Sequence, residues 1–283
     1  MRIIFIGYKM TQYNPLQKYF RQPKVFLSLP SKGLYYESGV LQGDYNNVPV
    51  FAMSGMDEII FKTPDALYSG EATVRVIESC VPYIKKAGKI PNIDIDSIIV
   101  AIRIATHGEI LNLERVCGNC GADNSYEIQL PKILDHLSTL KFENSIKIND
   151  EISLKIRPLT YSETTHYSIE NFKLQKKLMQ IVDMPVESQQ AVIDEIYKDL
   201  ADLQLDFFLS SIETVQLPDT SIADKQIISE WLKNSERDVF ATIKEKIESN
   251  KDSWQIPSQP VSCGSCDHKS NLDILLDQSS FFA

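Results

Sequence analysis

The sequence predicts an α+β fold in which a predominantly helical insertion separates two short β segments, each carrying a pair of cysteines. Two observations predict this architecture. The motif "VCGNCG" at 116–121 recurs as "SCGSCD" at 262–267, and short β-prone runs flank both copies. Between the two copies, the stretch 161–250 repeats apolar residues at helical spacing.

The composition excludes some classes of function. Hydrophobic residues make up 43% of the 283 residues and charged residues 24%, which is ordinary for a soluble globular protein. No apolar run approaches the roughly 18 residues of a membrane span, and "MRIIFIGYK" lacks the pattern of a signal peptide. We therefore expect synthesis in the cytosol and no membrane partner, with Met10 as a second candidate start. The net charge of −9 argues against nucleic-acid binding, which depends on basic residues that contact phosphates.

The first part of the chain is expected to form an arm followed by a small β/α domain. Residues 1–30 contain several prolines among polar and aromatic residues, so we interpret them as an extended N-terminal arm. Pro30 and Gly33 then interrupt the chain before a β-prone run at 48–53. Residues 31–130 are predicted to be the β/α domain that ends in the first cysteine pair.

Two helices are expected inside this domain. The first begins at Thr63 as N-cap with Pro64 at the first helical position, and it continues to about Lys86. The second begins at Asp94 and stops at Gly108, a residue that commonly ends helices.

Residues 131–256 are predicted to be a hairpin followed by the helical insertion. The segment "SIKINDEISLKIRPL" at 145–159 alternates with a period of two, which is typical of a β-hairpin. Thr160 and Glu163 have the spacing of a capping box and introduce the helical block.

The helical block is expected to break near Pro185 and Pro218. Its clearest feature is one apolar face, which we interpret as the core of a helix bundle. The residues of that face are Val192, Ile196, Leu200, Leu203, Phe207 and Ile212.

The two cysteine pairs predict one zinc site that joins the two ends of the insertion. Each pair has a strand on both sides and a turn at Gly118 or Gly264, which is expected to present backbone N–H groups to sulfur. The second pair lies in residues 257–283, interpreted as a second zinc knuckle and C-terminal tail. The predicted zinc ligands are Cys117, Cys120, Cys263 and Cys266.

Other interpretations of the cysteines are weaker. Disulfides are disfavoured in a reducing cytosol, and a redox CxxC belongs at a helix N-terminus, whereas neither pair begins an obvious helix. Four thiolates at about 2.3 Å complete a tetrahedral shell and leave no open position for a catalytic water, so the zinc ion is expected to be structural. The fifth cysteine, Cys80, is interpreted as a small buried apolar side chain.

No motif of a nucleotide-binding loop, a metalloprotease or a serine hydrolase is present. The four histidines are scattered, and the acidic pair Asp57 and Glu58 is interpreted as helix capping. We therefore predict that the protein is not an enzyme and has no small-molecule substrate.

Three segments in the first half of the chain precede the first cysteine pair in a fixed order: "LPSKGLYY" (29–36), "MSGMDEIIFKTPDALYSGEATVRVIESCV" (53–81) and "IIVAIRIATHGE" (98–109). Together with that pair and the terminal "CGSC…FF" segment, they resemble the T4-type bacteriophage baseplate proteins. The likeness covers roughly residues 27–130 and the C-terminal segment. It implies a structural or assembly protein of the central hub region of a contractile tail baseplate, with other baseplate or tail proteins as partners. The expected location is the host cytoplasm during assembly, or the virion.

The alternative functions belong to other classes. A zinc-ribbon protein that binds nucleic acid or acts in transcription is the main one, and a hydrolase with an unrecognised site is another. The oligomeric state is left open. We also predict that at least one terminus docks on another tail protein, because both are rich in large apolar side chains. These residues are Tyr13, Leu16, Tyr19 and Phe20 in the arm, and Phe281 and Phe282 at the C-terminal end.

Overall fold

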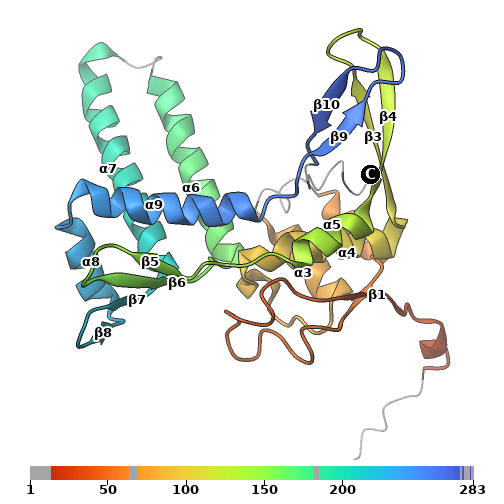
Figure 1. The fold of residues 1–283 in the computed structure, drawn as a ribbon, viewed down its shortest axis with the longest axis horizontal. Helices are drawn as coiled ribbons and strands as arrows, with labels where there is room; N and C mark the ends of the chain where they lie inside the picture. The colour runs from red at the N-terminus through yellow and green to blue at the C-terminus, as the bar shows by residue number, and fades with distance from the viewer. Residues whose placement is uncertain (1–13, 64–68, 182–184, 275, 277–280, 282–283) are drawn as a thin grey trace, which may run out of the picture.

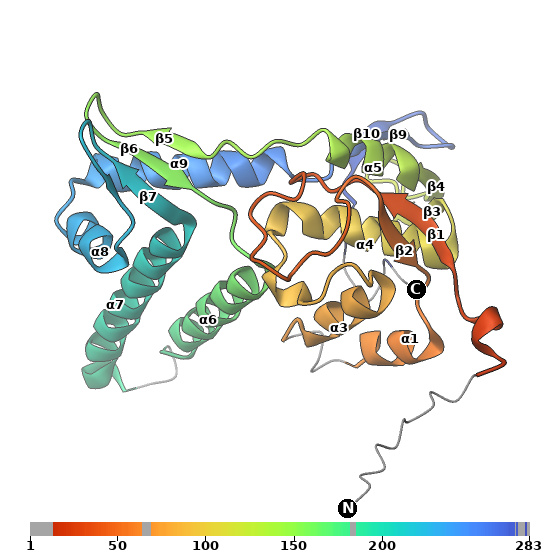
Figure 2. The ribbon, with the colours of Figure 1, turned by 90° about the horizontal axis from the view of Figure 1, so that it is seen from below.

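The computed structural model describes residues 14–63, 69–181, 185–274, 276 and 281. It confirms the α+β class, with a small β/α body, a ribbon of two cysteine-bearing hairpins, and a predominantly helical insertion between the ribbon halves (Figure 1). The ribbon and the long helices of the insertion lie at opposite ends of the molecule, and the β/α body connects them (Figures 1 and 2).

The N-terminal body is built around α4 (Asn92–His107), which is buried along most of its length. The sequence of α4 is apolar on almost every side because other elements cover it all round. The antiparallel strands β1 (Pro23–Leu27) and β2 (Val48–Phe51) pack against it, as do α3 (Glu71–Cys80) and α5 (Leu130–Ser138).

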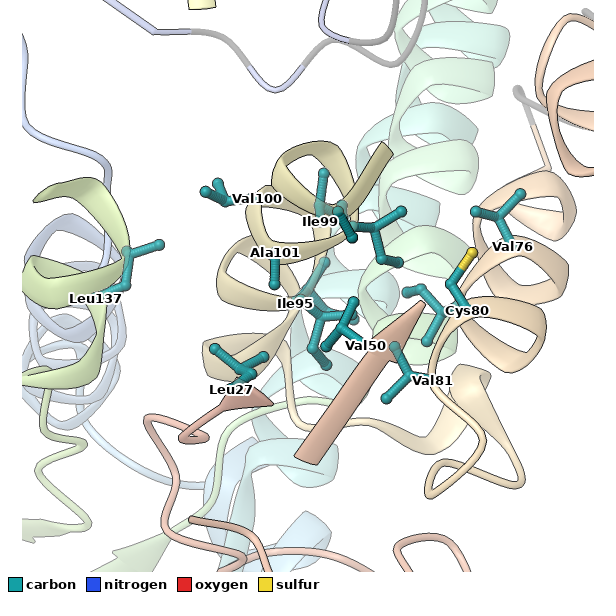
Figure 3. Packing of buried hydrophobic residues seen from close by; sticks show 14 of the residues in the cluster. Leu27, Val50, Val76, Cys80, Val81, Ile95, Ile99, Val100, Ala101 and Leu137 are labelled. Carbon is teal, nitrogen blue, oxygen red and sulfur yellow. The ribbon is translucent and has the colours of Figure 1, made fainter. Parts of the chain in front are cut away.

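The core of this body is made mainly of isoleucine, valine and leucine side chains that meet on α4 (Figure 3). Leu27 and Val50 approach from the strands, Cys80 from α3 and Leu137 from α5. Cys80 is fully buried, which confirms its interpretation as a core side chain.

A buried carboxylate attaches the loop 29–36 to α4. Asp94 accepts hydrogen bonds at Oδ1 from the backbone N–H of Ser31 (2.7 Å) and at Oδ2 from the hydroxyls of Ser31 (2.5 Å) and Tyr36 (2.8 Å). Burial raises the pKa of Asp94 to about 6 even though these donors favour the carboxylate. The motif "LPSKGLYY" therefore supplies the donors that make this buried acid tolerable.

The predicted first helix, from Thr63 to about Lys86, is not one continuous helix. The helix α1 (Gly55–Phe61) precedes it, and Thr63 lies just beyond the end of α1, where its hydroxyl donates to the carbonyl of Ile59 (3.2 Å). The helix α3 begins only after Gly70, whose φ of 73° is not helical. Residues 64–68, with Pro64, lie outside the described residues.

Other helix ends follow local chemistry. In α1, Ser54 and Asp57 form a reciprocal capping box, which confirms the interpretation of Asp57 as a capping residue. Gly108 ends α4 as predicted. The helix α3 stops at Cys80, short of the predicted Lys86, because the residue before a proline such as Pro82 is disfavoured in helical geometry.

The N-terminal arm is shorter than predicted among the described residues. The segment 23–27 forms β1, and Leu27 and Leu29 are part of the core. Before Pro23, the described chain holds only a short 3₁₀ turn, η1 (Gln17–Tyr19), in which no residue is buried.

The insertion contains an antiparallel sheet with strand order β5-β6-β7-β8. The predicted hairpin is confirmed as β5 (Ser145–Lys147) and β6 (Ser153–Ile156). The strands β7 (Ile212–Gln216) and β8 (Ser221–Ile222) lie inside the stretch predicted to be helical, so the prediction is wrong there. The β-branched residues of β7 favour a strand once β6 offers backbone partners.

Two helices pack with this sheet, and together they form a second body, the sheet body. The helix α8 (Lys225–Lys233) begins at the N-cap Asp224, and α9 (Arg237–Ser253) follows. Ile228 from α8 and Ile243 from α9 are buried with the apolar side chains of the sheet.

The helices α6 (Tyr161–Gln180) and α7 (Val186–Ser211) form an antiparallel pair that projects from the rest of the molecule (Figures 1 and 2). The capping box of Thr160 and Glu163 is confirmed, and α7 follows Pro185 as predicted. Val192, Ile196, Leu200 and Leu203 of the predicted apolar face pack inside this pair as core. Phe207 and Ile212 belong instead to the core of the neighbouring sheet, and Ile212 begins β7.

Candidate metal centre

Two separate hairpins carry the cysteine pairs. The strands β3 (Ile110–Val116) and β4 (Asp123–Gln129) enclose the first pair, and β9 (Gln259–Ser262) and β10 (Lys269–Leu272) enclose the second. Each hairpin is an independent two-stranded antiparallel sheet. The hairpins lie side by side in the structure although the whole insertion separates them in sequence (Figures 1 and 2).

The two turns have the same backbone hydrogen bonds. In the first, the N–H of Cys117 donates to the carbonyl of Ala122 (2.9 Å), and the N–H of Gly121 donates to the carbonyl of Cys117 (2.9 Å). In the second, Cys263 donates to His268 (2.9 Å), and Asp267 donates to Cys263 (3.0 Å). The pattern repeats residue for residue, as expected for two zinc knuckles.

The left-handed residue of each turn is not the glycine between the two cysteines. Gly121 (φ 72°) and Asp267 (φ 55°), each directly after the second cysteine of its pair, have positive φ, whereas Gly118 and Gly264 do not. The second turn does present an N–H group to sulfur, since Ser265 donates to Sγ of Cys263 at 3.4 Å. The glycine between the cysteines is therefore not required by backbone conformation.

The four sulfur atoms meet at one point. All four Sγ atoms lie within 4.8 Å of one another. Cys117 and Cys266 are 3.8 Å apart at sulfur, and Cys120 and Cys263 are 3.7 Å apart. A disulfide needs about 2.05 Å, whereas a tetrahedron with metal–sulfur bonds of about 2.3 Å has edges of about 3.8 Å. The spacing fits four ligands of one tetrahedral metal ion and not two disulfides.

The surroundings favour thiolates at the second pair. Hydrogen bonding from the N–H of Ser265 lowers the pKa of Cys263 to about 6, and the Asn119 side-chain amide (Nδ2 to Sγ, 3.5 Å) lowers the pKa of Cys266. At Cys120 the Ala122 N–H also favours the thiolate, but hydrogen bonds with the neighbouring sulfurs, together with burial, outweigh it and raise the pKa to about 12.

Three side chains connect the hairpins beside the sulfurs. Arg115 donates from Nη1 to the carbonyl of Asn271 (2.8 Å), and the Asn119 amide reaches Cys266. Asn124 accepts from the N–H of Gly264 (2.9 Å) and donates to the carbonyl of Ala122 (2.9 Å), so it contacts both knuckles. These residues were missed from the sequence because each acts on a residue about 140 or more positions away and no local pattern marks it.

The other singled-out residues lie away from this centre. Asp57 caps α1, and Cys80 lies in the core. Phe281 is only 2% exposed within the N-terminal core, and its carbonyl accepts a hydrogen bond from Arg103 Nε (2.8 Å). Phe282 and Tyr13 lie outside the described residues.

The fold and the site together define a class: an α+β protein whose ribbon is completed by cysteine pairs from both ends of a long insertion, with four sulfurs arranged as in closed structural sites. The chain belongs to the family described as T4 bacteriophage base plate protein, whose model matches residues 53–283. This match confirms the resemblance and extends it through the insertion. No curated protein and no solved structure gives a match. None of the described helices has the length and apolar character needed to cross a membrane.

Proposed function

We propose that the protein is a structural or assembly component of the central hub region of a contractile phage tail baseplate. It acts through contacts with other tail proteins and has no catalytic role. The family match over most of the chain carries this proposal. A four-thiolate site supports it because such a site leaves no open position for a reacting water.

Sedimentation tests the proposal. The tagged chain, produced during phage infection, is expected to sediment with baseplate intermediates. A chain that stays at the position of free protein throughout infection contradicts the proposal. Its presence or absence in purified virions distinguishes a retained component from one that acts only during assembly.

The charge of the ribbon argues against the nucleic-acid alternative. Residues 110–129 and 259–272 carry four acidic side chains, Glu114, Asp123, Glu127 and Asp267, and two basic ones, Arg115 and Lys269. A nucleic-acid interface requires an excess of basic residues.

The site is proposed to hold one structural zinc ion with Cys117, Cys120, Cys263 and Cys266 as ligands. The sulfur spacing supports this set. Elemental analysis of protein purified without chelator is expected to give one zinc per chain and no visible absorption band, whereas iron on four thiolates gives a coloured protein. Protein without bound metal contradicts the assignment.

The N-terminal arm is proposed to dock on another tail protein. Leu16, Tyr19 and Phe20 are 62%, 73% and 55% exposed. Arg21 fixes the base of the arm, since its guanidinium donates to the carbonyls of Ala52 (2.6 Å) and Ser79 (2.8 Å). Large apolar side chains held at a fixed place on the surface are typical anchors of protein contacts.

Deletion of residues 1–20 tests the arm. The shortened chain is expected to fold and bind zinc but to lose baseplate association. Association that survives the deletion places the contact elsewhere. Deletion of 281–283 is a different experiment, because Phe281 belongs to the core and its removal is expected to destabilise the fold.

A further inference from the structure

A groove of about 550 Å³ lies where the α6–α7 pair, α9 and the end of β6 meet. Its walls come mainly from residues 156–171, 200–211 and 244–254, and Asn92 and Phe142 complete the lining. Figure 1 shows α9 crossing the base of the projecting helical pair at this place.

The floor of the groove consists of half-buried apolar side chains. They are the margins of three different cores: Leu200 and Leu203 of the helical pair, Phe207 and Ile247 of the sheet body, and Phe142 and Trp254 of the N-terminal body. Each core leaves one side of these residues uncovered. A concave surface of this kind is typical of a binding site for apolar side chains.

Contacts within the walls hold the groove in shape. The hydroxyls of Tyr167 and Ser210 are 2.9 Å apart, and the Tyr167 ring meets Phe207 edge-on at 5.2 Å. Asn250 on α9 pairs with the backbone of Glu143, accepting from its N–H (3.1 Å) and donating to its carbonyl (3.0 Å). A site formed before binding loses little conformational entropy when it is occupied.

The charge of the groove is opposite to that of the chain. Its described lining includes Arg157, Lys244 and Lys251 and no acidic residue, in a protein of net charge −9. Arg157 is paired with Glu163, and the exposed Lys244 is paired with Glu248 on the same helix (3.7 Å), whereas Lys251 forms no ion pair with any described residue. Lys244 and Lys251 are seven residues apart and therefore share one face of α9. The buried indole N–H of Trp254 also finds no acceptor among the described residues.

We propose that this groove binds an acidic, apolar segment of a neighbouring baseplate protein. Its apolar side chains cover the floor, and its carboxylates lie beside Lys244 and Lys251. The volume suits a few side chains of one segment and not a whole domain. This inference rests on the proposed function, because it names the surface through which the protein meets a partner.

Site-specific photocrosslinking in phage-producing cells tests the occupant. A benzophenone amino acid replaces Asn171, an exposed residue of the groove, in the full-length chain. The control position is Lys173, which is exposed and lies about 200° away from Asn171 around the axis of α6. Position 171 alone is expected to crosslink a segment of another protein that contains both carboxylates and large apolar residues, identified by mass spectrometry. No crosslink, a crosslink to a second copy of this chain, or a segment without acidic residues overturns the proposal.

Charge reversal provides the second measurement. Lys244→Glu with Lys251→Glu is expected to lower the crosslink yield at least about tenfold, because like charges then face each other across the contact. Lys176→Glu with Lys177→Glu, on exposed positions of α6, makes the same change in net charge and is expected to leave the yield unchanged. Equal yields in the two double variants overturn the proposal. If the chain sediments with baseplate intermediates but gives no crosslink from position 171, only this inference is overturned. If the chain does not sediment with baseplate intermediates, the proposed function itself is contradicted.

Discussion

Single side chains hold neighbouring parts of the structure together by making several hydrogen bonds each. Asn124 hydrogen bonds to both knuckles, and Arg157 forms a two-pronged pair with Glu163 at the start of α6. In each case one residue makes several hydrogen bonds, so its removal breaks more than one of them.

Asn124→Ala is expected to lower the free energy of unfolding by about 1–2 kcal/mol, because it leaves the Gly264 N–H and the Ala122 carbonyl without this partner. Zinc release to a chromogenic chelator is expected to be faster, since the two knuckles are then less firmly aligned. The control is Asn112→Ala on exposed β3, which should change neither quantity. Equal behaviour of the two variants contradicts the role assigned to Asn124.

Glu163→Gln should show a pH-dependent loss of stability. Burial by itself raises the pKa of Glu163, but hydrogen bonds from Arg157 and Thr160 outweigh it and lower the pKa to about 2. Folding therefore favours the carboxylate, and its stabilisation is present above about pH 4.5 and lost as the pH falls through about 2. We expect a deficit of about 2 kcal/mol at pH 7 that shrinks towards zero below pH 3.

Urea unfolding of the parent protein and the variant, at pH 7 and below pH 3, measures this deficit in the free energy of unfolding. Exposed Glu195→Gln on α7 is the control and should stay within about 0.5 kcal/mol of the parent at either pH. A deficit that is independent of pH means that Glu163 acts by packing and not by charge.

At the scale of elements, some loops are possible only because a glycine lets two segments of backbone approach each other closely. The loop around Gly43 pairs with the chain after α3, where the N–H of Gln42 donates to the carbonyl of Tyr83 (2.8 Å). At Gly43, φ is 85°, and a Cβ atom would lie 2.4 Å from the Tyr83 ring. Gly39 has a similar φ of 80° but open space around it.

Gly39→Ala and Gly43→Ala separate backbone strain from steric exclusion. Gly39→Ala is expected to destabilise by about 1 kcal/mol, the cost of a left-handed alanine. Gly43→Ala should cost at least about 2 kcal/mol more, because the Tyr83 ring must also move. Thermal unfolding of both variants measures the difference, and equal losses show that the ring moves without penalty.

At the scale of the whole molecule, the ribbon connects both ends of the insertion to the main core. Leu111 and Ile128 of the first hairpin belong to that core, as do Leu272 and Phe281 from the C-terminal segment. A metal bound between Cys120 and Cys263, 143 residues apart, closes a long loop and so reduces the entropy of the unfolded chain.

Cys263→Ser is expected to destabilise the chain by about 3–5 kcal/mol, since it removes a metal ligand and the loop closure. Trp254 beside the main core and Trp231 beside the sheet core report the two bodies by fluorescence during urea unfolding. We expect at least the Trp254 transition to shift to lower urea. A chelator should shift the parent protein in the same direction and leave the variant unchanged. A parent protein insensitive to chelator contradicts a structural metal.

Local patterns in the sequence predicted several parts of this structure. The knuckle hairpins, the capping box of Thr160 and Glu163 and the Gly108 helix end are set by residues within a few positions of one another. The four clustered cysteines could also be predicted, because paired thiolates need two more ligands to complete a tetrahedron.

Only the tertiary structure decided the features that depend on distant partners. Residues 212–216 continue an apolar helical pattern but form β7, because β6 offers a free edge to β-branched side chains. The hydrogen bonds of Asn124 and the lining of the groove likewise involve segments that are far apart in the chain. Hydrogen bonds and packing between such segments form only after the loops between them have closed, and a local pattern of residues contains no information about which segments then meet.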